Sequence, residues 1–133
     1  MALRWYTTVI DCQDPRSLGA WWAEALQWTN VHDAEDEYVI IPSWVTPEDI
    51  RTTPWGRQGP GLVFVKVPGP KITKNRLHLD FAPHTSQDRT AEIARLKALG
   101  AHRVDVGQDA DVSWTVLADP EGNEFCVLSS REM

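Results

Sequence analysis

The sequence predicts an α+β fold made of two tandem βαβββ modules, and three observations lead to this prediction. The expected order of elements in residues 3–68, strand, helix and three strands, returns in residues 76–130 at a spacing of about 70 residues. The linker PGPKITKN between the two halves is too short to separate independent domains. The 133 residues suit one ordinary domain that buries roughly two-thirds of its unfolded surface. We therefore expect a single domain over residues 1–133, with module one at about 3–68 and module two at about 76–130.

Module one begins with residues 3–11, LRWYTTVID, which are rich in β-branched and aromatic residues and predict a strand. Asp14 offers an N-cap oxygen and Pro15 stands at the first helical position, where proline is favoured. Apolar residues then follow at helical spacing, so a helix is expected at 15–26. The remaining strands of this module are expected at 27–32, 37–41 and 62–67.

A Pro/Gly-rich loop at 42–61 carries Trp44 and Trp55 and shows no evident structure of its own. Loops of about 20 residues are uncommon and often act as lids or binding loops. One interpretation is a lid over an apolar or aromatic ligand. The other is a loop that two aromatic anchors fix to the surface, and the sequence leaves both open.

Module two is expected to begin with a strand at 77–82. Residues 85–88, TSQD, have the spacing of a capping box, an apolar stripe follows, and Gly100 supplies a C-terminal stop, which together predict the second helix. Three further strands are expected at 101–106, 113–118 and 124–129. On the last of these strands Glu124, Cys126 and Leu128 share one face.

The overall composition excludes several kinds of partner. The net charge is −6 and there is no Lys/Arg cluster, which argues against nucleic acid and anionic membranes. No apolar run approaches the roughly 20 residues that would span a bilayer. Cys12 and Cys126 lie in separate strand contexts and the N-terminus lacks a signal-peptide pattern, so we expect a cytoplasmic protein with reduced thiols.

The repeat, together with NRLHLDFAP at the start of the second half and WTVLADPEGNEFCVL at its end, resembles the glyoxalase-like branch of the vicinal oxygen chelate superfamily. This glyoxalase/bleomycin resistance/dioxygenase superfamily is matched from Leu3 to Ser129. The resemblance implies modules that form a half-barrel cavity, a homodimer, and often a divalent metal held by the first, fourth, fifth and eighth strands. Its members range from glyoxalase I and dioxygenases to metal-free bleomycin-binding proteins, so the fold alone does not name the function.

Of the four metal positions that the resemblance implies, only His78 on the fifth strand is a clear match. The first-strand position falls on Thr7, or on Trp5 if the register shifts by two residues. The fourth strand offers only Lys66, and Cys126 replaces the glutamate of the eighth strand. We therefore expect a degenerate metal site and no cofactor. A divalent metal remains possible through His78, Asp80, Glu124 and Cys126.

Without a metal, His78 and Glu124 could form an acid/base pair suited to proton abstraction next to a carbonyl. Asp80 could orient His78 or pair with Arg76. Cys126 could be a reactive thiol, although a lone strand cysteine is more often a small buried hydrophobe. The residues expected to bind the substrate are Trp5, Thr7, Trp44, Trp55, Asp80, Trp114 and Cys126.

These residues predict a protein that binds a small apolar or aromatic molecule, with lyase- or isomerase-like proton transfer if it is an enzyme. Two alternatives stay open. One is a metal-dependent lyase, isomerase or dioxygenase of the same superfamily, and the other is a resistance protein that sequesters a drug.

Overall fold

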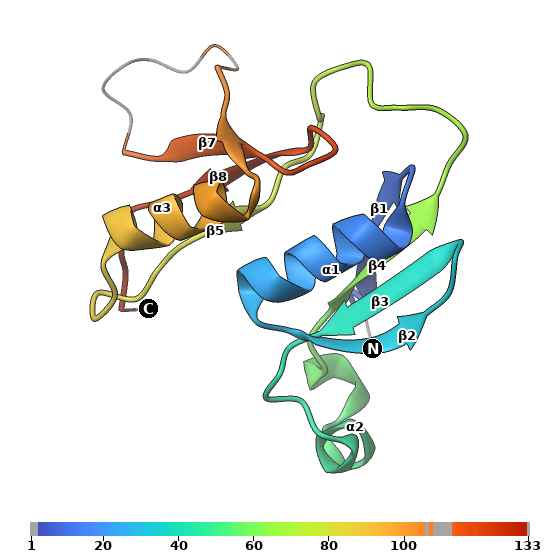
Figure 1. Cartoon of the computed structure of the whole chain (residues 1–133). Helices are drawn as coiled ribbons and strands as arrows, with labels where there is room; N and C mark the ends of the chain where they lie inside the picture. The colour runs from blue at the N-terminus through green and yellow to red at the C-terminus, as the bar shows by residue number, and fades with distance from the viewer. Residues whose placement is uncertain (1–2, 106, 108–112, 133) are drawn as a thin grey trace. The chain divides into compact units, whose positions relative to one another are not determined.

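The computed structural model describes residues 3–105, 107 and 113–132 and has an α+β fold (Figure 1). The chain divides into two compact units, Met1–Pro70 and Lys71–Met133. Each unit contains one four-stranded sheet. The element order of the first unit returns in the second, as the sequence predicts.

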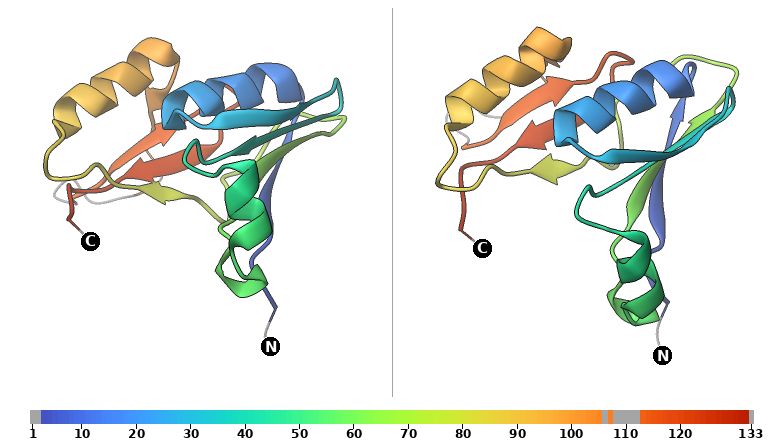
Figure 2. Two further views of the ribbon diagram at one scale, coloured as in Figure 1. Left: turned by 90° about the horizontal axis from the view of Figure 1, so that it is seen from below. Right: turned by 60° about the horizontal axis from the view of Figure 1, so that its bottom comes forward.

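The first unit consists of β1 (Thr7–Cys12), α1 (Pro15–Leu26), β2 (Thr29–Asp33), β3 (Glu37–Ile41) and β4 (Gly61–Lys66). The strand order in its sheet is β1-β4-β3-β2, with β1 parallel to β4 and the other pairs antiparallel. The helix α1 lies along one face of this sheet (Figure 2). It spans the residues predicted for it, because Asp14 caps it and Pro15 begins it.

The core of the first unit lies between α1 and the face of the sheet formed by alternate strand residues. Leu18 and Trp22 of α1 are buried, as are Ile40 and Phe64 of β3 and β4. A further core contact depends on a glycine, because a Cβ at Gly19 would lie 2.2 Å from the Tyr38 ring. Because successive side chains of a strand point to opposite faces, the residues between these buried ones lie on the other face of the sheet, which α1 does not cover.

The starts of two strands in the first unit, β1 and β2, differ from the sequence prediction by two residues or more. The first strand begins at Thr7 rather than Leu3, so Trp5 precedes it. Gln27 is not in a strand, because it takes the left-handed conformation that caps α1, and β2 begins at Thr29.

The expectation that residues 42–61 lack structure of their own is wrong. They contain α2 (Pro47–Thr52) and a short 3-10 turn, η1 (Trp55–Arg57). Thr46 begins α2 with a complete capping box, since its side chain and that of Asp49 each accept a backbone N–H. We call residues 42–60 the cap segment.

The second unit consists of β5 (Asp80–Phe81), α3 (Arg89–Leu99), β6 (His102–Arg103), β7 (Thr115–Ala118) and β8 (Glu124–Val127). Its strand order, β5-β8-β7-β6, repeats that of the first unit. Again the first and last strands are parallel and the other pairs are antiparallel. The two sheets therefore share one topology.

All four strands of the second unit are shorter than the sequence predicts. β5 is limited to two residues, although Cys126 N–H also donates to the Leu79 carbonyl just before it. β6 ends at Arg103, and the predicted end of that strand at Val106 lies outside the described residues. The prediction that residues 85–88 form a capping box is wrong, because Asp88 is itself the N-cap of α3.

The DPEGN turn leads directly into β8, and a buried carboxylate holds it together. Asp119 is fully buried, and its oxygens accept hydrogen bonds from the backbone N–H groups of Glu121 and Asn123 and from the Asn123 amide. Gly122 has φ 90°, a backbone conformation that glycine adopts without strain. This turn fixes where β8 starts and so places Glu124 and Cys126.

Within the described part of the chain, none of the helices has the length and apolarity needed to cross a membrane.

Candidate functional site

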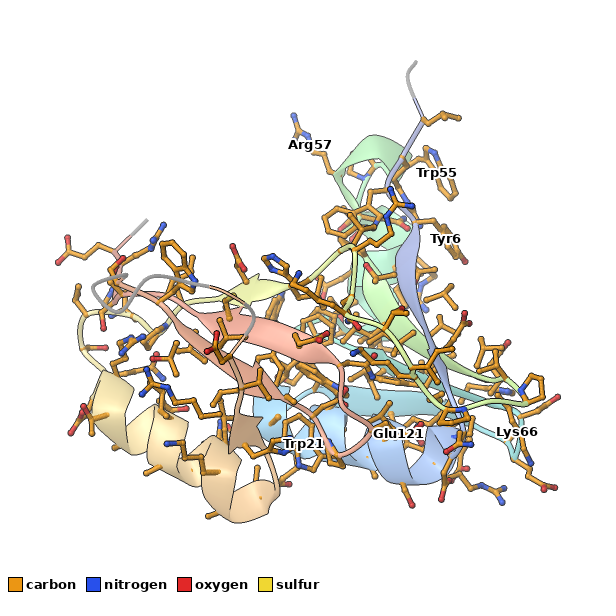
Figure 3. The ribbon with its side chains drawn as sticks, turned by 90° about the horizontal axis from the view of Figure 1, so that it is seen from above. Tyr6, Trp21, Trp55, Arg57, Lys66 and Glu121 are labelled. Atoms are coloured by element: carbon orange, nitrogen blue, oxygen red, sulfur yellow. The ribbon has the colours of Figure 1, made fainter. Side chains whose placement is uncertain are left out.

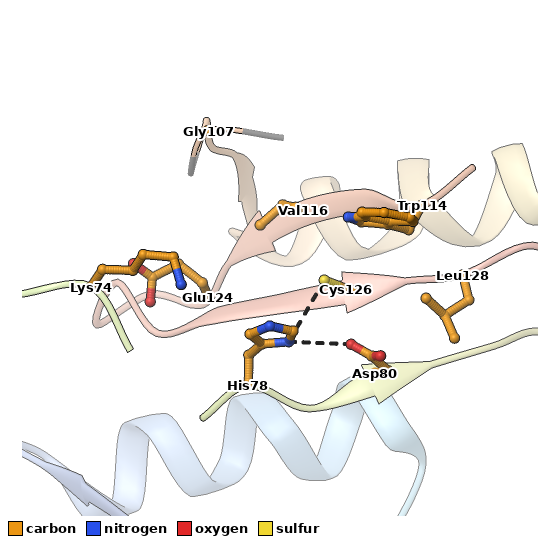
Figure 4. Close-up of a pocket in the computed structure, with 9 residues that line it drawn as sticks. All are labelled: Lys74, His78, Asp80, Gly107, Trp114, Val116, Glu124, Cys126 and Leu128. Carbon is orange, nitrogen blue, oxygen red and sulfur yellow. Dashed lines mark hydrogen bonds and ion pairs between the residues drawn. The ribbon is translucent and has the colours of Figure 1, made fainter. Parts of the chain in front are cut away.

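A pocket of about 380 Å³ opens on the sheet of the second unit (Figure 4). The described residues that line it all belong to that unit: Lys74, His78, Asp80, Gly107, Trp114, Val116, Glu124, Cys126 and Leu128. The volume lies in the range of about 300–1,000 Å³ that is usual for small-molecule sites. Five residues predicted from the sequence, His78, Asp80, Trp114, Glu124 and Cys126, therefore lie around one pocket.

The centre of the pocket is a cluster of three polar side chains. The Nδ1 atom of His78 lies 3.3 Å from Oδ1 of Asp80 and 3.9 Å from Sγ of Cys126. The β5–β8 pairing creates this arrangement, because it sets Asp80 directly opposite Cys126. Of the two partners expected for Asp80, the structure places His78 beside it. Both His78 and Asp80 remain about half exposed, so a ligand can reach them.

The Cys126 thiol is protonated at neutral pH. Its residue is buried, with 6% of its surface exposed, and burial together with the charge of Asp80 raises the pKa of Cys126 to about 11. A thiol in this state is a poor nucleophile. The geometry therefore favours the interpretation of Cys126 as a small buried side chain over that of a reactive thiol.

Glu124 lines the pocket, but both of its carboxylate oxygens are already engaged. Oε1 accepts from Lys71 Nζ at 3.0 Å, and Oε2 accepts from the Asn75 backbone N–H at 3.0 Å. Burial raises the pKa of Glu124, but these hydrogen bonds outweigh burial and hold the pKa below its ordinary value. Glu124 is therefore ionised and ties residues 71–75 to β8.

The walls of the pocket are mainly apolar. Trp114, Val116 and Leu128 supply them, and Trp114 is 39% exposed. Such walls suit the apolar or aromatic molecule expected from the sequence.

The remaining predicted residues belong to the first unit. Thr7 and Trp44 line a separate pocket there, while the Trp5 indole is exposed and donates to the Thr7 carbonyl. Trp55 stacks on the guanidinium of Arg4. That these four residues bind a substrate beside His78 therefore remains a prediction.

Two lysines near the pocket of the second unit were not predicted. Lys71 pairs with Glu124 across 53 positions of sequence, and Lys74 lines the pocket itself. The linker PGPKITKN shows both cations, but no spacing rule connects them to a glutamate so far along the chain. Only the fold brings these groups together.

The same pocket offers a set of donors that could hold a metal ion. One atom each of His78, Asp80 and Cys126 lies within 4.8 Å of the other two. A nitrogen, an oxygen and a sulfur donor suit zinc or Fe(II) better than a hard ion such as Mn(II). The thiol would have to lose its proton to bind, so metal binding is expected to depend on pH.

The repeated βαβββ order and the topology of both sheets define a protein of the vicinal oxygen chelate superfamily. The sequence model of the glyoxalase-like domain family matches residues 7–128, and the chain belongs to this family.

Solved structures agree with this assignment of the fold. A glyoxalase/bleomycin resistance protein/dioxygenase family enzyme from Burkholderia phytofirmans PsJN is 14% identical, with a TM-score of 0.66 over 97% of this chain and 100% of that one. The fosfomycin resistance protein FosX from Listeria monocytogenes, complexed with Mn(II) and sulfate, is 12% identical, with a TM-score of 0.67 over 98% and 93%. The oxidase ChaP-H2 is 14% identical, with a TM-score of 0.63 over 98% and 96%. No curated protein matches the chain.

Proposed function

We propose that the protein binds a small apolar or aromatic molecule in the pocket of the second unit and that His78 transfers a proton on it. The observation that carries this proposal is the His78–Asp80 pair at the centre of a pocket with apolar walls. The family supports a role in small-molecule chemistry but does not choose among its activities.

The pair is arranged as a general base and its orienting carboxylate. A carboxylate pairs favourably with a protonated nitrogen, so we assign the ring proton of neutral His78 to Nδ1, beside Asp80. Nε2 then carries the lone pair, and no described residue is hydrogen-bonded to it. Asp80 would also stabilise the imidazolium that forms when Nε2 accepts a proton.

The reaction that suits this pair is proton abstraction from a carbon next to a carbonyl group. Nε2 takes the proton, and the C–H electron pair moves toward the carbonyl to form an enolate. Addition of a proton from water to the other face of that carbon gives an isomer, and His78 then releases its own proton to the resulting hydroxide. Departure of a group from the neighbouring carbon with its bonding electrons gives an alkene, which would make the protein a lyase.

In this proposal the second catalytic residue expected from the sequence, Glu124, takes a different part. Its oxygens are committed to Lys71 and Asn75, so it holds the wall of the pocket while His78 moves the proton. Trp114 provides the flat surface against which an apolar substrate would lie.

The test is ligand binding and proton exchange measured with three proteins: wild type, His78→Gln and His102→Gln. His102 lies on β6 and does not line the pocket, so it is the matched control. A panel of aromatic ketones is screened by tryptophan fluorescence, and exchange of the α-proton is followed by NMR in D₂O. We expect binding in all three proteins and exchange that His78→Gln reduces at least 100-fold. Exchange that survives this substitution would refute the role of His78. Binding without exchange in wild type would point to a sequestering protein.

Metal-dependent chemistry is a second candidate, because the donors of His78, Asp80 and Cys126 cluster within 4.8 Å. These three residues would hold the ion, and a bound zinc or Fe(II) would polarise a carbonyl oxygen as a Lewis acid. We place metal-dependent chemistry second because the other expected metal positions match poorly: Thr7 lies in the first strand, and Lys66 on the fourth pairs with Glu35.

Elemental analysis separates the two candidates. The protein is purified untagged and without chelators and is then incubated with Zn, Fe, Mn, Ni and Co. The first proposal predicts less than one-tenth of an equivalent of tightly held metal. One equivalent that disappears in both Cys126→Ser and Asp80→Asn, but not in His102→Gln, would establish the metal site.

We further propose that the protein is a cytoplasmic homodimer. Support for the dimer comes from the sheet edge at β2, where all five residues are exposed and, among the described strands, only one side is paired. Sedimentation equilibrium would test this, and a mass of 15.0 kDa that stays constant with concentration would exclude the dimer.

A further inference from the structure

A second pocket, of about 500 Å³, lies in the first unit and shares no residue with the pocket around His78. Its floor comes from the sheet and includes Val39 and Val63. Leu62 and Phe64 alternate with Val63 and are buried, so the floor is the sheet face opposite α1. The cap segment supplies further lining residues, including Trp44 and Ile50. The pocket therefore joins one face of the sheet to the cap segment.

Large apolar side chains around this pocket are exposed in the free chain. Trp44 is 71% exposed, Val31 54% and Ile50 53%. The helix α2, which carries Ile50, buries none of its own residues. A ligand with an apolar body would cover this surface and gain roughly 25 cal/mol for each Å² removed from water.

The charged groups that line the pocket favour an anion. Arg4 and Arg57 are cations, and Asp49 is the one carboxylate among the lining residues. Asp49 is committed to the cap, since it accepts from the backbone N–H of Thr46 at 2.7 Å and from the Thr46 hydroxyl at 2.8 Å. Its two cations therefore make this pocket locally positive in a chain of net charge −6.

Arg4 is held rigidly. Its guanidinium carbon lies 3.8 Å from the ring centre of Trp55 and 4.7 Å from that of Tyr6, and Nη1 donates to Gln58 Oε1 at 2.6 Å. Its Nε is buried and has no hydrogen-bond partner among the described residues. Figure 3 shows Tyr6, Trp55 and Arg57 at the same end of the unit, where residues 55–57 lie beside the start of β1.

Arg57 is the more accessible of the two cations. It is exposed, lines the pocket and forms no ion pair with another described residue. An exposed residue that lines a pocket lies at its mouth, where an unpaired guanidinium can bind a carboxylate through two parallel hydrogen bonds.

We propose that this pocket is a binding site for a small molecule with a flat apolar body and a single anionic group such as a carboxylate. The body lies between Trp44 and the valines of the sheet, and the anion lies at Arg57 with Arg4 behind it. A cationic ligand would meet a net positive charge here, and a neutral one would gain no ion pair with Arg57.

Isothermal titration calorimetry with three matched probes tests this proposal: 2-naphthoate, 2-naphthylmethanol and 2-naphthylmethylammonium. The three share one aromatic body and differ in charge. We expect wild type to bind the carboxylate at least tenfold more tightly than the alcohol and to bind the ammonium most weakly. Equal affinities for all three probes, or no detectable binding of the carboxylate at millimolar concentration, would overturn the proposal.

Variants test the location of the site and distinguish the contribution of the anionic group to affinity from that of the apolar body. Arg57→Gln should reduce carboxylate affinity to that of the alcohol, whereas Arg51→Gln should change neither. Arg51 is the matched control because it lies on the same cap segment but pairs with Glu48 outside the pocket. Trp44→Ala should weaken both probes, and His78→Ala should weaken neither. An effect of Arg51→Gln equal to that of Arg57→Gln, or loss of binding in His78→Ala, would refute the assigned location. Thermal melts confirm that each variant is folded.

Discussion

Replacing Glu124 by glutamine should destabilise the protein, although the side chain keeps its size. The ion pair between Glu124 and Lys71 has a separation of 3.0 Å, and the two side chains are only 12% and 23% exposed. Hydrogen bonds to charged groups contribute about 1.5–3 kcal/mol, and glutamine keeps the bond from Asn75 but loses the charge. We expect a loss of about 2 kcal/mol. With an unfolding entropy of about 2.1 cal/mol/K per residue, this loss lowers Tm by roughly 7 °C.

The pH dependence gives this prediction a second readout. The pKa of Glu124 in the folded state lies below its ordinary value of 4.5, so its contribution to stability is fully present above about pH 4.5. It is lost as the pH falls through the folded pKa. The difference between wild type and Glu124→Gln should therefore be constant from pH 5.5 to 7 and shrink in more acidic solution.

The assay is urea or thermal unfolding followed by circular dichroism, with Glu48→Gln as the control. Glu48 pairs with Arg51 on the surface, where both side chains are 67% exposed, and such pairs contribute only about 0–1 kcal/mol. Lys71→Met and the double variant complete a mutant cycle that isolates the coupling. Equal losses in Glu124→Gln and Glu48→Gln, or a difference that stays constant down to pH 3, would refute the assigned ion pair.

Three further predictions concern packing, the thiol and the last turn. Gly19→Ala should destabilise by about 1–3 kcal/mol, because its Cβ would overlap the Tyr38 ring, and a denaturation curve with unchanged Tm would contradict this close contact. Alkylation of Cys126 by iodoacetamide should accelerate with a midpoint near pH 11, since burial raises its pKa to about 11, and a midpoint near that of free cysteine would show an activated thiol instead. Asp119→Ala should cost about 2–4 kcal/mol in unfolding experiments because it leaves the N–H groups of the turn without an acceptor, whereas a loss below 0.5 kcal/mol would mean that water replaces the carboxylate.

The parts of the structure that could be predicted from sequence depend on short-range signals. Asp14 and Pro15 mark the start of α1 within two adjacent residues, and strand alternation sets Glu124 and Cys126 on one face of β8. The Thr46–Asp49 capping box was equally local, but the surrounding prolines and glycines indicated a loop. In this segment the capping box predicts the helix correctly, whereas the proline and glycine content does not.

The parts that could not be predicted depend on contacts between distant segments. Arg4 and Gln58 are 54 positions apart, and nothing in either segment indicates that they are hydrogen-bonded. The same is true of Lys71 and Glu124. The sequence shows that these polar and charged side chains are present, whereas the fold decides which of them are in contact. The charge of each pocket is therefore a property of the fold.

The two carboxylates in the pocket of the second unit show how this matters for function. From sequence, Glu124 is expected to transfer a proton together with His78, and Asp80 is expected to orient His78 or pair with Arg76. In the structure the ionised Glu124 is paired with Lys71 and accepts a backbone N–H, whereas the partners of Asp80 among the described side chains are the imidazole of His78 and the thiol beside it. A carboxylate with its oxygens already occupied has little capacity to accept a substrate proton, and one that orients an imidazole makes that ring a better base. The partners of each group, rather than its residue type, are therefore the grounds on which we propose proton transfer by His78 and a supporting role for Glu124.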